Sequence, residues 1–204
     1  MEALLEFYAE PYDALSPVVC FGASPYQLVS ETRQLLPLAP GRPARYDDED
    51  RREGTCHVCR FFQPLAGWRP VEGTERRTAQ DFAHGMNALV DAYVPHAELS
   101  RVGLDNRHTH TPAALDETFP PAEARRMVRP WDCRETPKHA SWPNMAALEL
   151  AVVDGQCLDR RLSTPALVRR EVAAWEAARH AKATVQWPFT VAKARTKRLH
   201  RYPA

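Results

Sequence analysis

Apolar residues gather along the chain in short blocks that are separated by polar segments rich in proline and glycine. Blocks of this length that are bounded by turn residues are typical of β-strands. The first block should end where Gly22 and Pro25 follow it, and residues 63–67 should join the next two as a hairpin. Pro130 would place the last block at a sheet edge or end it early. The predicted strands are residues 18–21, 55–62, 68–74, 98–104 and 126–133.

Four further stretches are expected to be helical, and the longer ones place apolar residues three or four positions apart, which is the helical period. Thr78 should cap the first helix, and Thr164 should cap the last, with Pro165 at its first helical position. Strands followed by alternating helices and strands favour an α/β fold with a mixed sheet and helices on its faces. The predicted helices are residues 78–93, 112–119, 144–158 and 164–181.

The overall composition is that of a globular protein, with 44% hydrophobic and 26% charged residues among 204. This length suits one domain with its own core, or one domain with a small appendage. No apolar run approaches the roughly 18 residues of a membrane span. The N-terminal residues carry acids instead of the basic start of a secretory signal. We therefore expect a cytoplasmic protein without a membrane segment.

Charge is distributed unevenly, although the net charge is only +1. Residues 159–204 contain eleven Lys and Arg against three Asp and Glu, a balance of +8. A basic C-terminal part is compatible with binding to the phosphate backbone of DNA. A solvated helical face would give the same pattern, so charge alone leaves both interpretations open. The candidate DNA-binding residues in this part are Arg169, Arg170, Lys193, Arg195, Lys197 and Arg198.

The five cysteines include one pair with a spacing seen in metal sites, Cys56 and Cys59, with His57 between them. A structural zinc site needs about four ligands, and no second pair of this kind follows. The pair also lies in a predicted strand. Two small buried thiols are therefore the favoured interpretation, and a zinc site is the alternative.

The chemistry that stands out lies at the end of a predicted strand. The apolar run that closes at Leu104 is followed at once by Asp105, and Asn144 opens a helical stretch further along. A carboxylate at a strand end, with a second motif at the start of a helix, is how two-metal nucleases build their sites. Asp105 is therefore the candidate metal ligand of this chain.

Several motifs in this order closely resemble the catalytic domain of mariner-related bacterial insertion-sequence transposases of the DDE type. The similarity covers almost the whole chain, from about residue 8 to residue 203. It implies a ribonuclease-H-like fold, in which a mixed five-stranded sheet is flanked by helices. The implied organisation is a catalytic core at residues 1–160 with a basic helical extension at 161–204 packed on it. The motifs are Arg52–Thr55 (REGT), Phe61–Trp68 (FFQPLAGW), Thr74–Thr78 (TERRT), Leu104–Asn106 (LDN), Thr109–Leu115 (THTPAAL), Phe119–Arg125 (FPPAEAR) and Thr136–His139 (TPKH).

The resemblance also implies Mg²⁺-dependent cleavage and transfer of DNA strands, with three carboxylates that hold two metal ions. Asp105 matches the second acid of the family. Gly22 stands where the first acid is expected, and Ala147 stands where the third is expected, three residues after Asn144. Neither replacement has a ligating side-chain atom, so the resemblance predicts a degenerate active site. Glu149 is a nearby carboxylate, but two helical steps turn it by about 200° away from position 147.

Other residues near the motifs have expected roles that follow from the resemblance. His110, Lys138 and His139 should contact DNA phosphate or support the site. A rebuilt site of histidines around Asp105 is an alternative, although imidazole suits softer metals than Mg²⁺. Family members normally carry helix-turn-helix units before the catalytic domain, so another polypeptide would have to supply them here.

Two functional hypotheses follow for this chain. The first is a truncated transposase domain that has lost its catalytic activity. The alternative is a non-enzymatic module that binds DNA, forms a homodimer, or pairs with an intact transposase and inhibits it.

Overall fold

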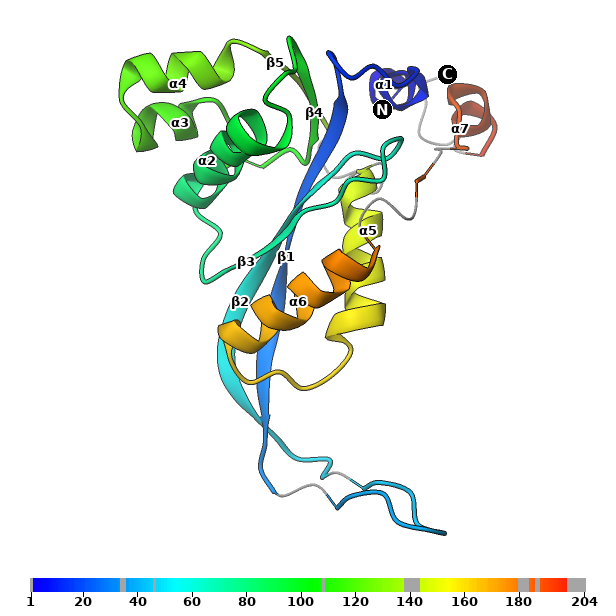
Figure 1. The fold of residues 1–204 in the computed structure, drawn as a ribbon. Helices are drawn as coiled ribbons and strands as arrows, with labels where there is room; N and C mark the ends of the chain where they lie inside the picture. The colour runs from blue at the N-terminus through cyan, green and yellow to red at the C-terminus, as the bar shows by residue number, and fades with distance from the viewer. Residues whose placement is uncertain are drawn as a thin grey trace.

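The computed structural model describes residues 2–33, 36–45, 47–107, 109–137, 144–179, 184–185 and 188–197. Their five strands form one sheet with the order β3-β2-β1-β4-β5 (Figure 1). β2 is antiparallel to both of its neighbours, β1 and β3, whereas β4 is parallel to β1 and β5 is parallel to β4. The predicted mixed five-stranded sheet is therefore confirmed. The strands are β1 (Val18–Glu31), β2 (Asp50–Phe62), β3 (Val71–Thr74), β4 (Ser100–Leu104) and β5 (Trp131–Glu135).

Helices cover both faces of this sheet, because successive strand residues point to opposite sides. On one face, α2, α3 and α4 bury a core that includes Phe21, Phe61 and Val102. On the other face, α5 and α6 bury a second core around Leu28 and Val58. The helices are α1 (Glu2–Ala9), α2 (Ala79–Ala88), α3 (Ala113–Thr118), α4 (Pro121–Val128), α5 (Met145–Val153), α6 (Pro165–Arg179) and α7 (Val191–Lys197), with π-helical turns η1 (Leu89–Tyr93) and η2 (Asp154–Leu158).

The predicted helix starts and ends are mostly confirmed. Thr78 caps α2 with a reciprocal pair of bonds to Asp81, which satisfies amide groups that the first helical turn leaves unpaired. The strand predicted at residues 126–133 is wrong in its first half, which belongs to α4. Pro121 starts this helix at a position where proline needs no amide partner. The short helices α1 and α7 were not predicted.

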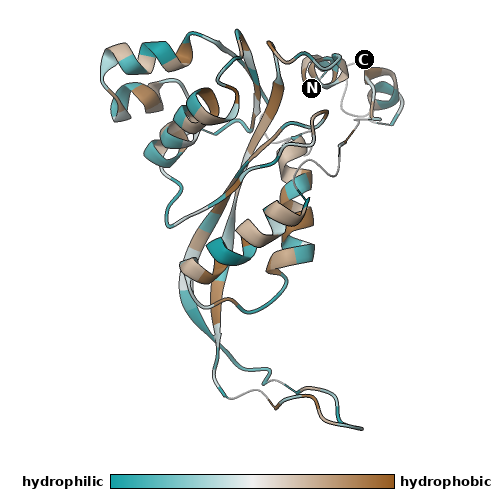
Figure 2. Cartoon of the chain, viewed as in Figure 1, coloured by the Kyte–Doolittle hydropathy of each residue, from teal (hydrophilic) through white to brown (hydrophobic). Residues whose placement is uncertain are grey.

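The first strand is longer than its sequence indicates, since β1 continues through Gly22 and Pro25 to Glu31. β4 pairs only with residues 18–20 of β1, so the missing amide of Pro25 faces no strand. The β1–β2 ribbon extends well away from the body (Figure 1), and apolar residues return at its far end (Figure 2). Leu36 and Leu38, in the connection beyond β1, are 62% and 77% exposed.

A buried cluster of charges fixes α5 on the sheet. Glu149 on α5 is only 4% exposed, and Arg60 and Arg69 beside it are fully buried. Its Oε2 atom lies 3.7 Å from Arg60 Nη2 and 3.5 Å from Arg69 Nε, and Arg179 on α6 lies 3.7 Å from Oε1. These separations exceed ordinary hydrogen-bond distances, so charge attraction holds the pairs. Arg60 also donates a hydrogen bond of 3.0 Å to the main-chain oxygen of Glu149.

Burial lowers the pKa of Arg60 to about 10, and the charge of Glu149 opposes that shift. Arg60 is therefore still protonated at neutral pH. Its guanidinium lies 4.7 Å from the centre of the Trp175 ring on α6, a distance at which a cation–π attraction is expected. The cluster thus joins α5, β2 and α6.

We predict that Glu149→Gln destabilises the fold by about 3 kcal/mol or more, because it removes the buried carboxylate that lies among the arginines. Chemical denaturation of the purified chain at pH 7 measures this effect. Glu171→Gln is the matched control, since Glu171 is a glutamate on α6 that pairs with two arginines at the surface. Equal stability of the two variants would contradict the assigned role of Glu149.

Candidate functional site

The three positions at which the resemblance places the acids line one open cavity of about 220 Å³. Gly22 comes from the middle of β1, Asp105 from the end of β4 and Ala147 from the first turn of α5. The chain folds so that residues distant in sequence converge here, because β1 and β4 are adjacent and parallel. The full lining is Gly22, Ala23, Ser24, Asp105, Arg107, Asn144, Ala147, Leu150, Ala151 and Asp154.

Asp105 is the carboxylate at the centre of this arrangement and is 8% exposed. Its Oδ2 atom accepts a hydrogen bond from Arg107 Nε. Its Oδ1 atom lies 2.6 Å from His110 Nδ1. Burial alone would raise the pKa of Asp105, but His110 and Arg107 outweigh it and hold that pKa below its usual 3.8. The carboxylate is therefore ionised and already balanced by cationic or polar groups.

His110 is buried behind Asp105 and does not face solvent. Its ring stacks on Phe82 at 5.0 Å and meets the edge of Phe21 at 5.1 Å. Of the two roles expected for His110, support of Asp105 fits these surroundings, whereas contact with DNA phosphate would need an exposed ring.

Asn144 joins the start of α5 to β1, a role that the sequence analysis did not assign. Its side-chain oxygen accepts from the amide of Ala146 at 3.0 Å, which caps the helix. Its side-chain amide donates to the main-chain oxygen of Phe21 at 2.9 Å. An asparagine before a helical stretch is a recognisable cap, but its second bond depends on the tertiary fold.

Gly22 lies directly beneath α5. A Cβ atom at this position would lie 3.1 Å from Ala146 Cβ and 3.2 Å from Leu150 Cδ1. Both separations are shorter than ordinary van der Waals contacts. A larger side chain at position 22 would therefore require α5 or its side chains to move by a few tenths of an ångström.

Glu149 does not substitute for the missing acid. It points into the buried arginine cluster and is absent from the lining of the cavity. Asp154, in η2, is the second carboxylate of the cavity and was missed by the sequence analysis. Burial raises the pKa of Asp154.

The residues of the cavity do not fit a two-metal centre. One of the three acid positions retains a carboxylate, and no group of three or more His, Cys, Asp or Glu residues suited to a metal ion occurs among the described residues. The distance between Ala147 and Asp154 along the helix is a further argument against a two-metal centre. Asp154 follows Ala147 by seven residues, or roughly 10 Å of helix, so it does not restore the missing ligand position.

The basic candidate residues do not form one surface. Arg169 and Arg170 lie on α6, which crosses the sheet, whereas Lys193, Arg195 and Lys197 lie on α7 beside α1 (Figure 1). Several are engaged within the chain: Arg195 pairs with Glu2 at 2.7 Å and Arg170 with Glu171 at 2.8 Å. Lys138, His139 and Arg198, and also His108, lie outside the described residues.

Cys56 and Cys59 lie on opposite faces of the sheet, because three steps along a strand reverse the side-chain direction. Cys56 belongs to the core under α5 and α6, whereas Cys59 packs against the core under α2. The two thiols therefore do not chelate one ion, and the zinc hypothesis is wrong.

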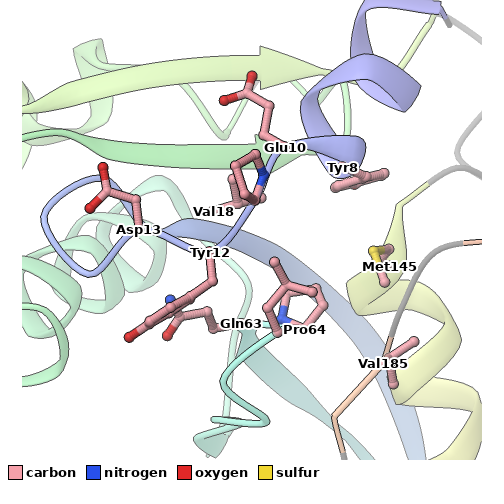
Figure 3. A pocket seen from close by; sticks show the side chains of 11 residues that line it. Tyr8, Glu10, Tyr12, Asp13, Val18, Gln63, Pro64, Met145 and Val185 are labelled. Atoms are coloured by element: carbon pink, nitrogen blue, oxygen red, sulfur yellow. The ribbon is translucent and has the colours of Figure 1, made fainter.

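A second pocket adjoins Met145, the first residue of α5 (Figure 3). Tyr8 and Tyr12 line it together with Gln63 and Pro64 from the end of β2. Its volume of about 20 Å³ is close to the space of a single water molecule. It is a small gap in the packing.

Comparison with known protein families agrees with the resemblance seen in the sequence motifs. The sequence model described as DDE superfamily endonuclease matches residues 17–166. No curated protein matches the chain.

No helix among the described residues is long and apolar enough to cross a membrane.

Solved structures with similar folds come from transposition and integration complexes. A chain of the Mos1 strand transfer complex has a TM-score of 0.60 at 17% identity, covering 89% of this chain and 53% of that chain. The Mos1 mariner paired end complex with Mn gives 0.56 at 18%, covering 89% and 54%. An intasome of simian T-cell lymphotropic virus gives 0.51 at 10%, covering 93% and 56%. These likenesses confirm the ribonuclease-H-like fold, and the chain spans about half the length of the chains it matches.

The electrostatics of Asp105 predict a pH dependence of stability. Because its pKa is lower in the folded state, ionised Asp105 stabilises the fold at neutral pH, and this contribution is lost as the pH falls below about 3.8. We expect Asp105→Asn to lower the free energy of unfolding at pH 7 by about 1–2 kcal/mol and to change it little near pH 2. Urea denaturation at both pH values measures the difference. The same loss at both would contradict the assigned pairing, and exposed Asp116→Asn serves as the control.

Proposed function

Because the chain belongs to the DDE superfamily endonuclease family, we propose that it is a transposase-type domain that no longer cleaves or joins DNA. One observation carries this proposal. The three positions where the family's acids are expected line a single cavity, and only Asp105 has a carboxylate there. That carboxylate is already in contact with Arg107 and His110.

The physical argument concerns charge and ligands. Two-metal catalysis needs several oxygen ligands that hold both ions on either side of the reacting phosphate. Gly22 and Ala147 supply none. The guanidinium of Arg107 at Asp105 would also repel an approaching divalent cation. Mg²⁺ is the metal expected from the family, and this set of residues does not fit it.

We predict that the purified chain neither nicks nor joins DNA when Mg²⁺ or Mn²⁺ is supplied. A supercoiled plasmid assay measures nicking, and labelled oligonucleotides measure strand transfer. Metal-dependent cleavage that disappears in Asp105→Ala would overturn the proposal. Cleavage that persists in that variant would reveal a contaminating nuclease.

A gain-of-ligand variant is the matched positive control for this prediction. Gly22→Asp combined with Ala147→Glu returns both acids, and it should bind Mn²⁺ in calorimetry where the natural chain does not. The variant should also be less stable, because Ala146 and Leu150 crowd position 22. Gly22→Ala measures that steric cost without adding a charge. A folded double variant that gains no affinity for Mn²⁺ would contradict the placement of the site.

A second candidate function is pairing with another chain of this kind, which would make the domain a non-enzymatic partner or inhibitor. The projecting β1–β2 ribbon (Figure 1) supports it, because Leu36 and Leu38, in the connection between these strands, are exposed. Contiguous exposed apolar surface often marks a protein contact. The similar Mos1 chains come from paired end and strand transfer complexes, which supports DNA as a further partner.

We predict that replacing both leucines with serine abolishes self-association, or association with an intact relative, without unfolding the chain. Sedimentation velocity at several protein concentrations measures the association, and circular dichroism checks the fold. Leu148→Ser is a suitable control, since Leu148 is a half-exposed leucine elsewhere on the surface. A natural chain that stays monomeric alone and beside an intact relative would refute this candidate function.

A further inference from the structure

One edge of β1 is open beyond the end of β4. Residues 18–20 pair with β4, but from Gly22 onward β1 is paired only with β2. The amide of Phe61, opposite Phe21, donates to Pro70 on the far side of β2. Residues 21, 23, 25 and 27 of β1 therefore direct their main-chain groups away from β2, because groups two residues apart share an edge.

At the two ends of this open edge the main-chain groups are hydrogen-bonded, whereas in the middle, among the described residues, they are not. The oxygen of Phe21 accepts from Asn144, and the amide of Val29 donates to Leu162 at 3.0 Å. Between them, the main-chain groups of Ala23 and Gln27 and the oxygen of Pro25 bond to no other residue that the structure describes. These groups are a template for one added strand.

A groove runs along the same edge. The cavity at Asp105 and a neighbouring open cavity beside Tyr26 share Asp154 in their linings. β1 forms one wall, and α5 with η2 forms the other. Residues 22–27 of an extended strand span roughly 20 Å, so the groove has the length of about six peptide residues.

The charge of this groove favours a cationic occupant. Its charged lining residues are Asp105, Arg107, Asp154 and Asp159. Arg107 is paired with Asp105, whereas Asp154 and Asp159 form no ion pair with a described residue. Without metal ions, these carboxylates repel the phosphates of DNA and attract Lys or Arg side chains.

We propose that this groove binds an extended basic segment of a partner protein, which adds as a strand to the open edge of β1. The inference rests on the proposed function, since it requires a cavity without metal ions. Every second side chain of an added strand would face the wall formed by α5 and η2, so a partner with alternating basic residues fits best. Pro25 offers no amide, which weakens plain backbone pairing and makes the charge contacts decisive for selectivity.

The test uses the full chain and fluorescent octapeptides, measured by anisotropy at low salt. A peptide of alternating lysine and valine should bind at least about tenfold tighter than its glutamate counterpart. Asp154→Asn with Asp159→Asn should remove most of that preference. Exposed Asp116→Asn with Glu117→Gln, on α3, is the matched control and should leave binding unchanged.

Amide hydrogen exchange shows where the peptide binds. The lysine peptide should slow the exchange of the backbone amides of Ala23 and Gln27. N-methylation of the peptide at alternate residues removes its backbone donors, and one of the two methylated registers should lose binding while the other keeps it. Any of four results would overturn the inference. Two concern binding: equal affinity for the lysine and glutamate peptides, or equal affinity for the two methylated peptides. Two concern hydrogen exchange: protection of amides other than those of Ala23 and Gln27, or protection of these two amides by single-stranded DNA. The nuclease assay is separate, so a failure here leaves the proposed function standing.

Discussion

Cationic or polar side chains surround both of the buried carboxylates that the structure describes. Glu149 lies among three arginines beneath α5, and Asp105 lies between Arg107 and His110 at the end of β4. An unpaired charge in either position would cost several kcal/mol. In a metal-dependent site the ions would balance the carboxylates. Here Arg107 and His110 lie against Asp105, where ions would lie in a metal-dependent site.

The two clusters are linked through α5. Glu149 holds this helix from below, and Asn144 ties its first turn to the oxygen of Phe21. The helix thereby lies close enough to β1 that Gly22 leaves little room for a side chain. An acid at position 22 would need both space and a cation, so the tight packing there agrees with the glycine that the sequence has at this position.

The sequence predicted the parts of the fold that depend on local patterns. Thr78 and Pro165 mark helix starts through their own side chains, and the run that ends at Leu104 is a buried strand. β1 was predicted too short because the pairing with β2, and not the local residues, carries the strand through Gly22 and Pro25. The helix α4 was missed because Pro121 was not recognised as its start, and part of it was assigned to a strand.

The candidate site, like the fold, was predicted from the sequence only in part. The positions of Gly22, Asp105 and Ala147 came from motifs, and they line one cavity. The surroundings of His110 and the cluster at Glu149 depend on residues far apart in the sequence, such as Phe82 with His110 and Arg179 with Glu149. Asp154 had no motif to mark it. The central claim is that Asp105 is balanced by protein side chains and holds no metal, and a crystal structure soaked in Mn²⁺ tests it most directly. The account predicts no anomalous density beside Asp105, with Arg107 in contact with the carboxylate, whereas an ion bound to Asp105 would contradict it.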